Sequence, residues 1–415
     1  MIADMQRARM MCRHLLQYGW EAEVLAPDLS HQPLQCIEPQ AAQFFDPGIP
    51  FHATSPRGGK FWDILGSSTL AWRGLWPVLS EGTGLLRGGR YDLVFFSTAH
   101  YMLTLAGCSW RKRHGVPFVI DLHDPWHARS VPRPELARGL RGRILTAVAA
   151  RSERAVLSAA SGVISVSPSY LEAITRHYGA QVFGWQKTGC RRVEPFAYEP
   201  TETAAARRAV GDSAADGDSA TIAYCGAGGR VMRASWRVLC QALADLKSRD
   251  SSLLESVRFV FKGTSLHYRG GDSLEMVEAA REEGVAHLVS EDPARISYGD
   301  SIQLVVGADG VLILGVDDPG YMASKLFSYL SAGKPLLAVL RTGSVMVPFL
   351  QGYPGVTVLE FGPDGSPGQE TSEKLRSYLA DVRTKRVFNR EAALAARSAS
   401  AMTQRLVQCF ESCVA

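Results

Sequence analysis

Gly-Tyr-Met-Ala-Ser-Lys-Leu-Phe-Ser-Tyr-Leu-Ser-Ala-Gly-Lys-Pro, residues 320–335, is the most informative part of this chain, and the apolar run 336–340 follows it. The segment predicts a loop, a short helix and a buried strand. Ser324 is expected to cap the helix through its hydroxyl. Gly333 permits a left-handed cap at the other end, and Pro335 prevents the helix from continuing.

The start of this helix is also expected to bind an anion. Free backbone N–H groups and the positive end of the helix dipole attract phosphate. Lys325 stands beside that end, so the segment predicts a site for a diphosphate. Leu326, Phe327 and Leu330 have the spacing that turns one helical face toward a core.

The segment resembles the donor-site helix of family 4 glycosyltransferases, which have the GT-B fold and carry a similar Lys-Leu-Phe-Glu-Tyr-Leu-Ala-Ala-Gly-Lys-Pro run. In that family a glutamate is thought to hold the ribose of a nucleotide sugar, and Ser328 stands at its position. Gly320 stands at a second acidic position of the family. The resemblance implies two Rossmann-like doubly wound α/β domains that face each other across a cleft, a nucleotide-sugar donor and no bound metal.

Length and composition are those of a soluble globular protein. A chain of 415 residues is too long for one core and fits two domains. No apolar run reaches the roughly 20 residues that span a bilayer, and the N-terminus lacks the apolar core of a signal peptide. We therefore expect a cytoplasmic protein, and one that can lie at the inner face of the membrane.

The net charge and the cysteines give further expectations. A net charge of +4 suits phosphate ligands, and no basic-aromatic motif indicates nucleic acid. The eight cysteines contain no CxxC pair, so reduced thiols are the simplest interpretation. Cys409 and Cys413 share a helical face, but without a histidine partner a metal site there is the less favoured alternative.

Alternating strand-like and helix-like segments predict parallel sheets covered by helices in both halves. The expected domains are residues 1–195, residues 196–390 and a C-terminal helix, 391–415, that packs back toward the first domain. Residues 200–220 have the composition of a linker. The expected strands are residues 21–26, 93–97, 118–122, 162–166, 220–225, 258–261, 287–289, 310–314 and 336–340.

The first half lacks an expected element. Its first helix, residues 5–18, has no strand before it, although a doubly wound domain usually begins with a central strand. Family members carry a glycine-rich acceptor loop after that strand. Either this domain lacks both, or the true start lies upstream.

Polar residues follow the strand 118–122. His123 and Asp124 stand where ligands bind at the carboxyl edge of such sheets. By resemblance, His123 is the histidine that faces the donor sugar, and Asp124 orients the loop or the acceptor. The alternatives are a capped turn with a packed histidine, or a metal held with Asp121 and His127, which Pro125 disfavours.

The second half offers further donor-site candidates. Gly226 to Gly229 resemble a phosphate-binding crossover loop, and Arg230 and Arg233 follow it. By resemblance these arginines hold the diphosphate, although solvated surface arginines are the alternative. Gly263 and Thr264 stand where the nucleotide packs in the family, with an ordinary turn as the alternative. Residues 317–320, Asp-Asp-Pro-Gly, predict a turn rather than a metal motif.

Residues 57–90 mix tryptophans with arginines, a composition that suits the headgroup region of an anionic membrane. A packed helix pair with solvated arginines is the alternative. Together these features predict a retaining glycosyltransferase that moves a sugar to a glycan or lipid-linked acceptor in cell-surface polysaccharide or glycoconjugate synthesis. A non-catalytic GT-B homologue and a sugar-nucleotide epimerase remain alternatives.

Overall fold

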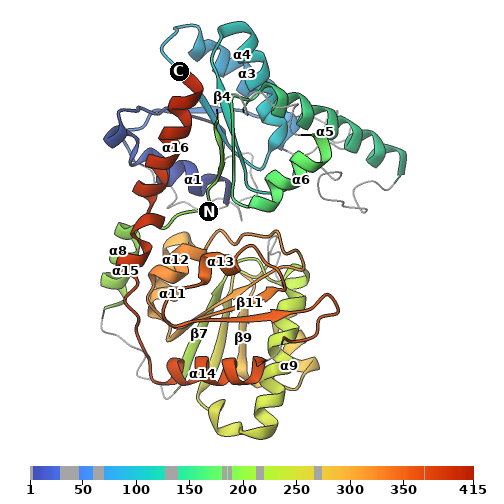
Figure 1. Cartoon of the computed structure of the whole chain (residues 1–415), viewed down its shortest axis with the longest axis vertical. Coiled ribbons are helices and arrows are strands. Elements are labelled where there is room, and N and C mark those ends of the chain that lie inside the picture. The colour runs from blue at the N-terminus through green and yellow to red at the C-terminus, as the bar shows by residue number, and fades with distance from the viewer. Residues whose placement is uncertain are drawn as a thin grey trace. The chain divides into compact units, whose positions relative to one another are not determined.

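The computed structural model describes most of the chain and divides it into two compact units. Unit 1 comprises Met1–Pro195 and Ala399–Ala415, and unit 2 comprises Phe196–Ser398 (Figure 1). The structure describes residues 3–28, 46–58, 70–126, 139–179, 185, 189–211, 219–265, 273–368 and 370–415.

Unit 1 contains two parallel sheets. The larger has the order β3-β4-β5-β6, formed by β3 (Val94–Ser97), β4 (Phe118–Leu122), β5 (Gly162–Ser165) and β6 (Arg191–Val193). A separate two-stranded sheet pairs β1 (Val24–Pro27) with β2 (Phe51–Thr54). Every residue of β4 is buried, as expected for a central parallel strand.

Helices cover both faces of the larger sheet of unit 1. Ile120 of β4 faces a core built with Trp110 and Leu157. That core includes residues of α3 (Leu70–Leu86), α4 (Leu105–His114), α5 (Gly139–Ala159) and α6 (Pro168–Tyr178). On the other face α16 (Ala399–Val414) contacts β4 and β5 and packs against α1 (Ala3–Cys12). Short 3-10 turns occur at η1 (Leu15–Tyr18) and η5 (Tyr101–Thr104).

Unit 2 has one six-stranded parallel sheet of order β12-β11-β10-β7-β8-β9 (Figure 1). Its strands are β7 (Ala220–Cys225), β8 (Val257–Lys262), β9 (Val289–Asp292), β10 (Gly310–Leu314), β11 (Leu336–Arg341) and β12 (Val356–Phe361). The strand order reverses between β7 and β10. The carboxyl ends of these two strands form the topological switch point, where ligands bind in this class of sheet.

The helices of unit 2 precede, connect and follow these strands. They are α8 (Pro200–Val210), α9 (Arg233–Arg249), α10 (Glu275–Glu282), α11 (Tyr298–Gly307), α12 (Leu326–Ser331), α13 (Val347–Leu350), α14 (Thr371–Arg383) and α15 (Glu391–Leu394). Trp236 of α9 is fully buried and meets Phe259 and Phe261 of β8 edge-on. Such aromatic contacts fasten α9 to the sheet behind the switch point.

The structure confirms the predicted alternation of strands and helices, with corrections. The helix predicted at 5–18 ends at Cys12, before a separate 3-10 turn, and β2, β6 and β12 were not predicted. Residues 200–220 are not a linker throughout, because Pro200–Val210 form α8 and the Glu199 side chain accepts a hydrogen bond from the Thr201 N–H. The strand predicted at 287–289 begins at Val289, after a 3-10 turn. The C-terminal segment is not one helix, because Ser398 is extended and residues up to it belong to unit 2.

Within the described residues no strand precedes α1, and β1 does not join the sheet of β3. No described helix combines the length and apolar character needed to cross a membrane.

The expectation of reduced thiols is wrong for two cysteines. Cys190 and Cys409 form a disulfide, which joins the segment before β6 to α16. Their Cα atoms are 4.9 Å apart, within the usual range. Gly162 lies against the Cys190 sulfur, because any Cβ there would overlap it. The alternative of a metal at Cys409 and Cys413 is excluded, since the Cys409 sulfur is already bonded.

Candidate functional site

The switch point of unit 2 brings Lys325 against Gly226. Gly226 follows β7 with φ of 110°, and its N–H donates to the Lys262 carbonyl at 2.8 Å. Lys325 Nζ lies so close to the Gly226 backbone that a Cβ at residue 226 would overlap it. The first glycine of the predicted phosphate loop and the predicted phosphate lysine are therefore neighbours.

Two buried tyrosines surround the Lys325 ammonium. Nζ lies 5.2 Å from the Tyr224 ring centre and 5.9 Å from that of Tyr329. The Tyr329 hydroxyl accepts from the Cys225 N–H at 3.0 Å and donates to the Cys225 carbonyl at 3.2 Å, which fixes the ring against the end of β7. Burial lowers the pKa of Lys325 to about 8, and interaction with the Cys225 thiol opposes this only in part. The cation is therefore poorly solvated, and a bound anion would stabilise it.

The helix after Lys325 begins differently from the prediction. Lys325 itself occupies the N-cap position, and no side-chain hydrogen bond caps the helix, so the predicted Ser324 cap is wrong. The predicted turn before it is confirmed, because Asp318 Oδ1 accepts from the Gly320 N–H at 2.8 Å. α12 has six residues, and its buried residues include Leu326, Phe327 and Leu330, as the spacing predicted.

Arginines hold the far end of α12. Arg390 is 3% exposed and donates to the Leu330 carbonyl at 3.1 Å and to the Lys334 carbonyl at 2.9 Å. Arg207 donates to the Ser331 carbonyl at 2.7 Å. These bonds satisfy carbonyls that a helix end leaves unpaired, and they fix the position of the helix behind Lys325.

The two predicted diphosphate arginines are both exposed. Arg230 lies in a 3-10 turn, Gly229–Val231. Arg233 is the first residue of α9 and forms an ion pair with Glu282 at 2.6 Å. The structure therefore brings Lys325 to the glycine loop, whereas it directs the Arg233 guanidinium toward α10. Their binding roles stay predictions.

The predicted nucleotide-contact residues occupy the neighbouring strand end. The Gly263 N–H donates to the Asp292 carbonyl at 2.9 Å. The Thr264 hydroxyl donates to Glu291 at 2.6 Å, and Glu291 also accepts from the Met276 and Val277 N–H groups at the start of α10. Thr264 is thus already hydrogen-bonded within unit 2. Ser328 is half-buried on α12.

Sequence reasoning missed Glu275, the first residue of α10. One carboxylate oxygen of Glu275 is buried beside Gly229 of the glycine loop and has no hydrogen-bond partner. A buried unpaired oxygen at a loop that should bind a ligand is unusual. Acidic residues are common in the first turn of a helix, so no sequence pattern singles out Glu275. Sequence reasoning also missed Tyr224 and Tyr329, because buried aromatic residues are typical of a core.

In unit 1, His123 lies at the carboxyl end of β4 and contacts Asp121. Residues two apart on a strand share a face. The His123 Nε2 is 2.5 Å from Asp121 Oδ2, and Arg7 Nε from α1 donates to the same oxygen. Burial alone would raise the pKa of Asp121, but the charges and hydrogen bonds of Arg7 and His123 hold it below the usual value.

Asp124 differs from His123 in exposing its side chain. Its N–H donates to the Tyr101 hydroxyl at 2.9 Å, and the same hydroxyl donates to the Asp124 carbonyl at 2.7 Å. The Tyr101 and Trp126 rings stack with their centres 5.2 Å apart, which helps to fix the loop after β4. His127, named in the alternative metal site, lies outside the described residues. In the described part of the chain, no three His, Cys, Asp or Glu side chains form a group that could hold a metal.

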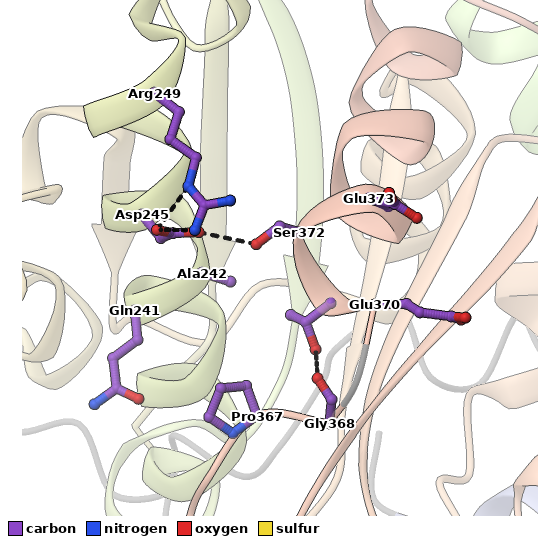
Figure 2. Close-up of a pocket in the computed structure, with 10 residues that line it drawn as sticks. Gln241, Ala242, Asp245, Arg249, Pro367, Gly368, Glu370, Ser372 and Glu373 are labelled. Atoms are coloured by element: carbon purple, nitrogen blue, oxygen red, sulfur yellow. Dashed lines mark hydrogen bonds and ion pairs between the residues drawn. The ribbon is translucent and has the colours of Figure 1, made fainter.

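A separate pocket of about 550 Å³ lies between α9 and α14 (Figure 2). Across it Asp245 accepts from Ser372 at 2.9 Å, and within α9 it accepts from Arg249 at 3.1 Å. None of its lining residues is a predicted site residue, and its acidic groups do not favour a phosphate.

Comparison with known proteins identifies the first unit. Residues 5–182 match the family model described as a glycosyl transferase 4-like domain. Among curated proteins, none matches the chain. HepE from Anabaena, solved with UDP-glucose, is 15% identical with a TM-score of 0.58, and the match covers 98% of this chain and 96% of HepE.

The chain has the GT-B fold, and its residues 5–182 are similar to the glycosyl transferase 4-like domain. Two further structures support this fold. A glycosyltransferase from Rickettsia africae is 10% identical, with a TM-score of 0.59 and coverage of 99% and 94%. A UDP-forming α,α-trehalose-phosphate synthase from Burkholderia vietnamiensis is 12% identical, with a TM-score of 0.54 and coverage of 86% and 80%. The predicted fold is therefore confirmed, and the match of residues 5–182 agrees with the predicted family and enzyme class.

Proposed function

We propose that this glycosyltransferase takes a sugar from a UDP-sugar donor, with retention at the anomeric carbon, and that Lys325 binds the donor diphosphate. The observation that carries the proposal is the position of Lys325 Nζ against Gly226 at the switch point of the unit 2 sheet. The solved complex of HepE with UDP-glucose supports UDP as the nucleotide. The UDP-forming activity in the name of the trehalose-phosphate synthase agrees with it.

The proposed reaction depends on stabilising the negative charge of the leaving diphosphate. When the glycosidic bond to the diphosphate breaks, negative charge grows on the leaving phosphate. The Lys325 ammonium and the backbone N–H groups of the glycine loop stabilise that charge, with Arg230 and Arg233 as further cations. In the proposed mechanism the leaving phosphate helps to take the acceptor proton. His123 contacts the donor sugar, Asp124 orients the acceptor, and no metal is required.

On the nucleotide side, Gly263, Thr264 and Ser328 are proposed to contact the base and ribose. Serine at 328 replaces a carboxylate with a weaker neutral acceptor, so we expect modest selectivity for the ribose.

The acceptor is proposed to be a glycan or a lipid-linked sugar in polysaccharide synthesis at the inner face of the cytoplasmic membrane. Trp76 on α3 is 56% exposed, and the Arg57 guanidinium lies 6.0 Å from its ring centre. Arg73 of the same helix donates to the Arg57 carbonyl at 2.7 Å. An exposed tryptophan with nearby arginines suits an anionic headgroup layer. Vesicles with and without phosphatidylserine would test this contact, and equal binding of wild type and a Trp76→Ala variant would contradict it.

Calorimetric titration with UDP, GDP and their sugars tests the donor site. Lys325→Ala should weaken UDP binding roughly 10- to 100-fold, because a charge-assisted hydrogen bond contributes about 1.5–3 kcal/mol. Lys334→Ala is the matched control, since Lys334 is also half-buried with a pKa lowered by burial but lies before β11, at the amino edge of the sheet. Equal losses in both variants, or no binding of any nucleotide, would remove the proposed site.

A non-catalytic binding protein is the second candidate. The observation in its favour is the loss of both acidic residues of the family motif, since Gly320 and Ser328 stand in their place. Nucleotide binding without donor hydrolysis or transfer would support this candidate, and release of UDP from a UDP-sugar would exclude it.

A further inference from the structure

Three buried side chains of unit 1 form a continuous hydrogen-bonded group. Arg7 is 0% exposed, Asp121 is 1% and His123 is 5%. They come from α1, from β4 and from the residue directly after it. Asp121 Oδ2 accepts from both Arg7 Nε and His123 Nε2. Charged groups this deeply buried are costly unless each is paired, and here one carboxylate oxygen serves two donors.

The surroundings hold Arg7 in one orientation. Its Nη2 donates to the Glu194 carbonyl at 2.5 Å, and its Nη1 lies 3.3 Å from the Met402 sulfur on α16. The Glu194 carboxylate in turn binds Arg405 of α16, at 2.8 Å and 2.7 Å. The guanidinium is thus fixed by groups from β4, from the residue after β6 and from α16, and it cannot leave Asp121 without losing several bonds.

This arrangement determines the protonation of the His123 ring. An ionised carboxylate can only accept hydrogen bonds, so the proton of neutral His123 must be on Nε2. Nδ1 is then an acceptor. The Arg7 charge also opposes a second proton on the ring, because it offsets the negative charge of Asp121 that would otherwise stabilise an imidazolium.

We propose that Arg7 is a positioning residue for the sugar-transfer site: acting through Asp121, it holds the His123 ring in one orientation and in the neutral Nε2-protonated tautomer. The inference rests on the proposed function, in which His123 contacts the donor sugar. A neutral ring there accepts a hydrogen bond from a sugar hydroxyl and places no extra cation beside the anomeric carbon, where positive charge develops during transfer.

Among the described residues, the elements packed against His123 carry several ionisable groups. They include Arg7 and Arg9 of α1, Asp121 of β4, Asp124 after β4, Glu194 after β6, and Arg405 of α16. The wild-type protein gives the first test. Nitrogen-15 NMR of the histidine rings, with the His123 signal assigned by His123→Gln, should show the Nε2-protonated neutral form at pH 7. A signal from the Nδ1-protonated form or from imidazolium at that pH would overturn the proposal.

Variants give the second test. Arg7→Gln should raise the pH at which His123 titrates by about one unit, because the carboxylate then faces the imidazolium alone. It should also lower kcat at least about tenfold while UDP affinity in unit 2 stays within twofold. Arg7→Lys should restore part of kcat. Arg405→Lys is the matched control, since Arg405 is a part-buried arginine of unit 1 that pairs with the Glu194 carboxylate.

The outcomes separate the two proposals. An unchanged His123 titration in Arg7→Gln would overturn the positioning role, whatever the activity. If Arg7→Gln does not fold, the wild-type tautomer and the Arg7→Lys titration decide it. Absence of sugar transfer by the wild type would instead refute the proposed function. The NMR result would still report the protonation state of the His123 ring.

Discussion

Lys325 and Gly226 occupy the same corner of unit 2, where the ammonium fills the space that a side chain at residue 226 would need. Neighbouring strands β7 and β10 bring the two segments together at the switch point of the sheet. The glycine therefore does two things: it turns the chain with φ of 110°, and it leaves room for the cation.

Replacing Gly226 with alanine should displace Lys325 and weaken UDP binding roughly tenfold. The control is Gly343→Ala, because Gly343 also has a positive φ, 79°, but nothing lies within 4 Å of its added Cβ. Both variants pay the backbone cost of roughly 1–2 kcal/mol, and only the first disturbs the ammonium. Calorimetry and urea unfolding separate the two effects. Equal UDP affinity in both variants would show that displacement of Lys325 by the new Cβ does not weaken UDP binding.

UDP affinity should fall as pH rises through about 8, the value to which burial lowers the pKa of Lys325. The ammonium binds the diphosphate, and the neutral amine does not. The secondary ionisation of a phosphate, near pH 6, is complete by then, so the ligand does not change. Titrations at pH 7 and 9.5 check this, and Lys325→Met should show a flatter profile. The same affinity at both pH values would argue against Lys325 as the anchor.

The contribution of Lys325 to the free energy of unfolding should change with pH in the opposite direction and rise where UDP affinity falls. Because the folded pKa of Lys325 lies below that of an exposed lysine, the unfolded chain binds more protons between pH 8 and 10.5. This group therefore makes unfolding harder as pH rises through that window. Denaturant unfolding without ligand should show a difference in slope between wild type and Lys325→Met, with the variant the less pH-dependent of the two.

Arg390 should be one of the most sensitive positions of unit 2. It donates to the carbonyls of Pro354, Leu330, Lys334 and Gly355, and burial lowers its pKa to about 10. Arg390→Met leaves those buried carbonyls unpaired and should cost about 3 kcal/mol or more. Arg386→Met is the control, since Arg386 is exposed, pairs with Asp381 at the surface and lies over the Phe388 ring, with none of the carbonyls that Arg390 binds among these contacts. Similar unfolding midpoints for both variants would refute the assignment.

Removing the disulfide with the pair Cys190→Ala and Cys409→Ala should lower the stability of unit 1 by a few kcal/mol, roughly 2–5. Cys413→Ala leaves the bond in place and is the control. Thermal unfolding gives the comparison, and counting reactive thiols by mass spectrometry before and after reduction checks the bond itself. An equal loss of stability in Cys413→Ala would show that altered packing, and not loss of the disulfide, is responsible.

Local patterns in the sequence predicted most of the described strands, because buried parallel strands are continuous apolar runs such as Phe118–Leu122. Strands β2, β6 and β12 were missed. Lys325 was also predicted from its motif. The glycine loop that contains Gly226 was only weak evidence for a phosphate site, since it is the strand order that brings Gly226 to Lys325. The link from Arg7 to His123 joins residues far apart in the chain, and no spacing rule reaches across that distance.

The errors have physical causes. Residues 200–210 are rich in alanine, which suits a helix as well as a linker, and the cap from Glu199 with Pro200 at the start decides between them. Ser324 was expected to cap, but the turn closed by the Leu326 N–H and the Ala323 carbonyl moves the N-cap position to Lys325. The disulfide depends on how α16 returns to unit 1, which cysteine spacing does not reveal.

The bond between Cys190 and Cys409 closes a covalent ring around the whole of Phe196–Ser398. A protease that cuts once inside that ring would not release a fragment. The two pieces would stay together on a non-reducing gel and separate only after a thiol reagent is added, so a nicked molecule could keep its first unit intact and pass unnoticed as full-length protein.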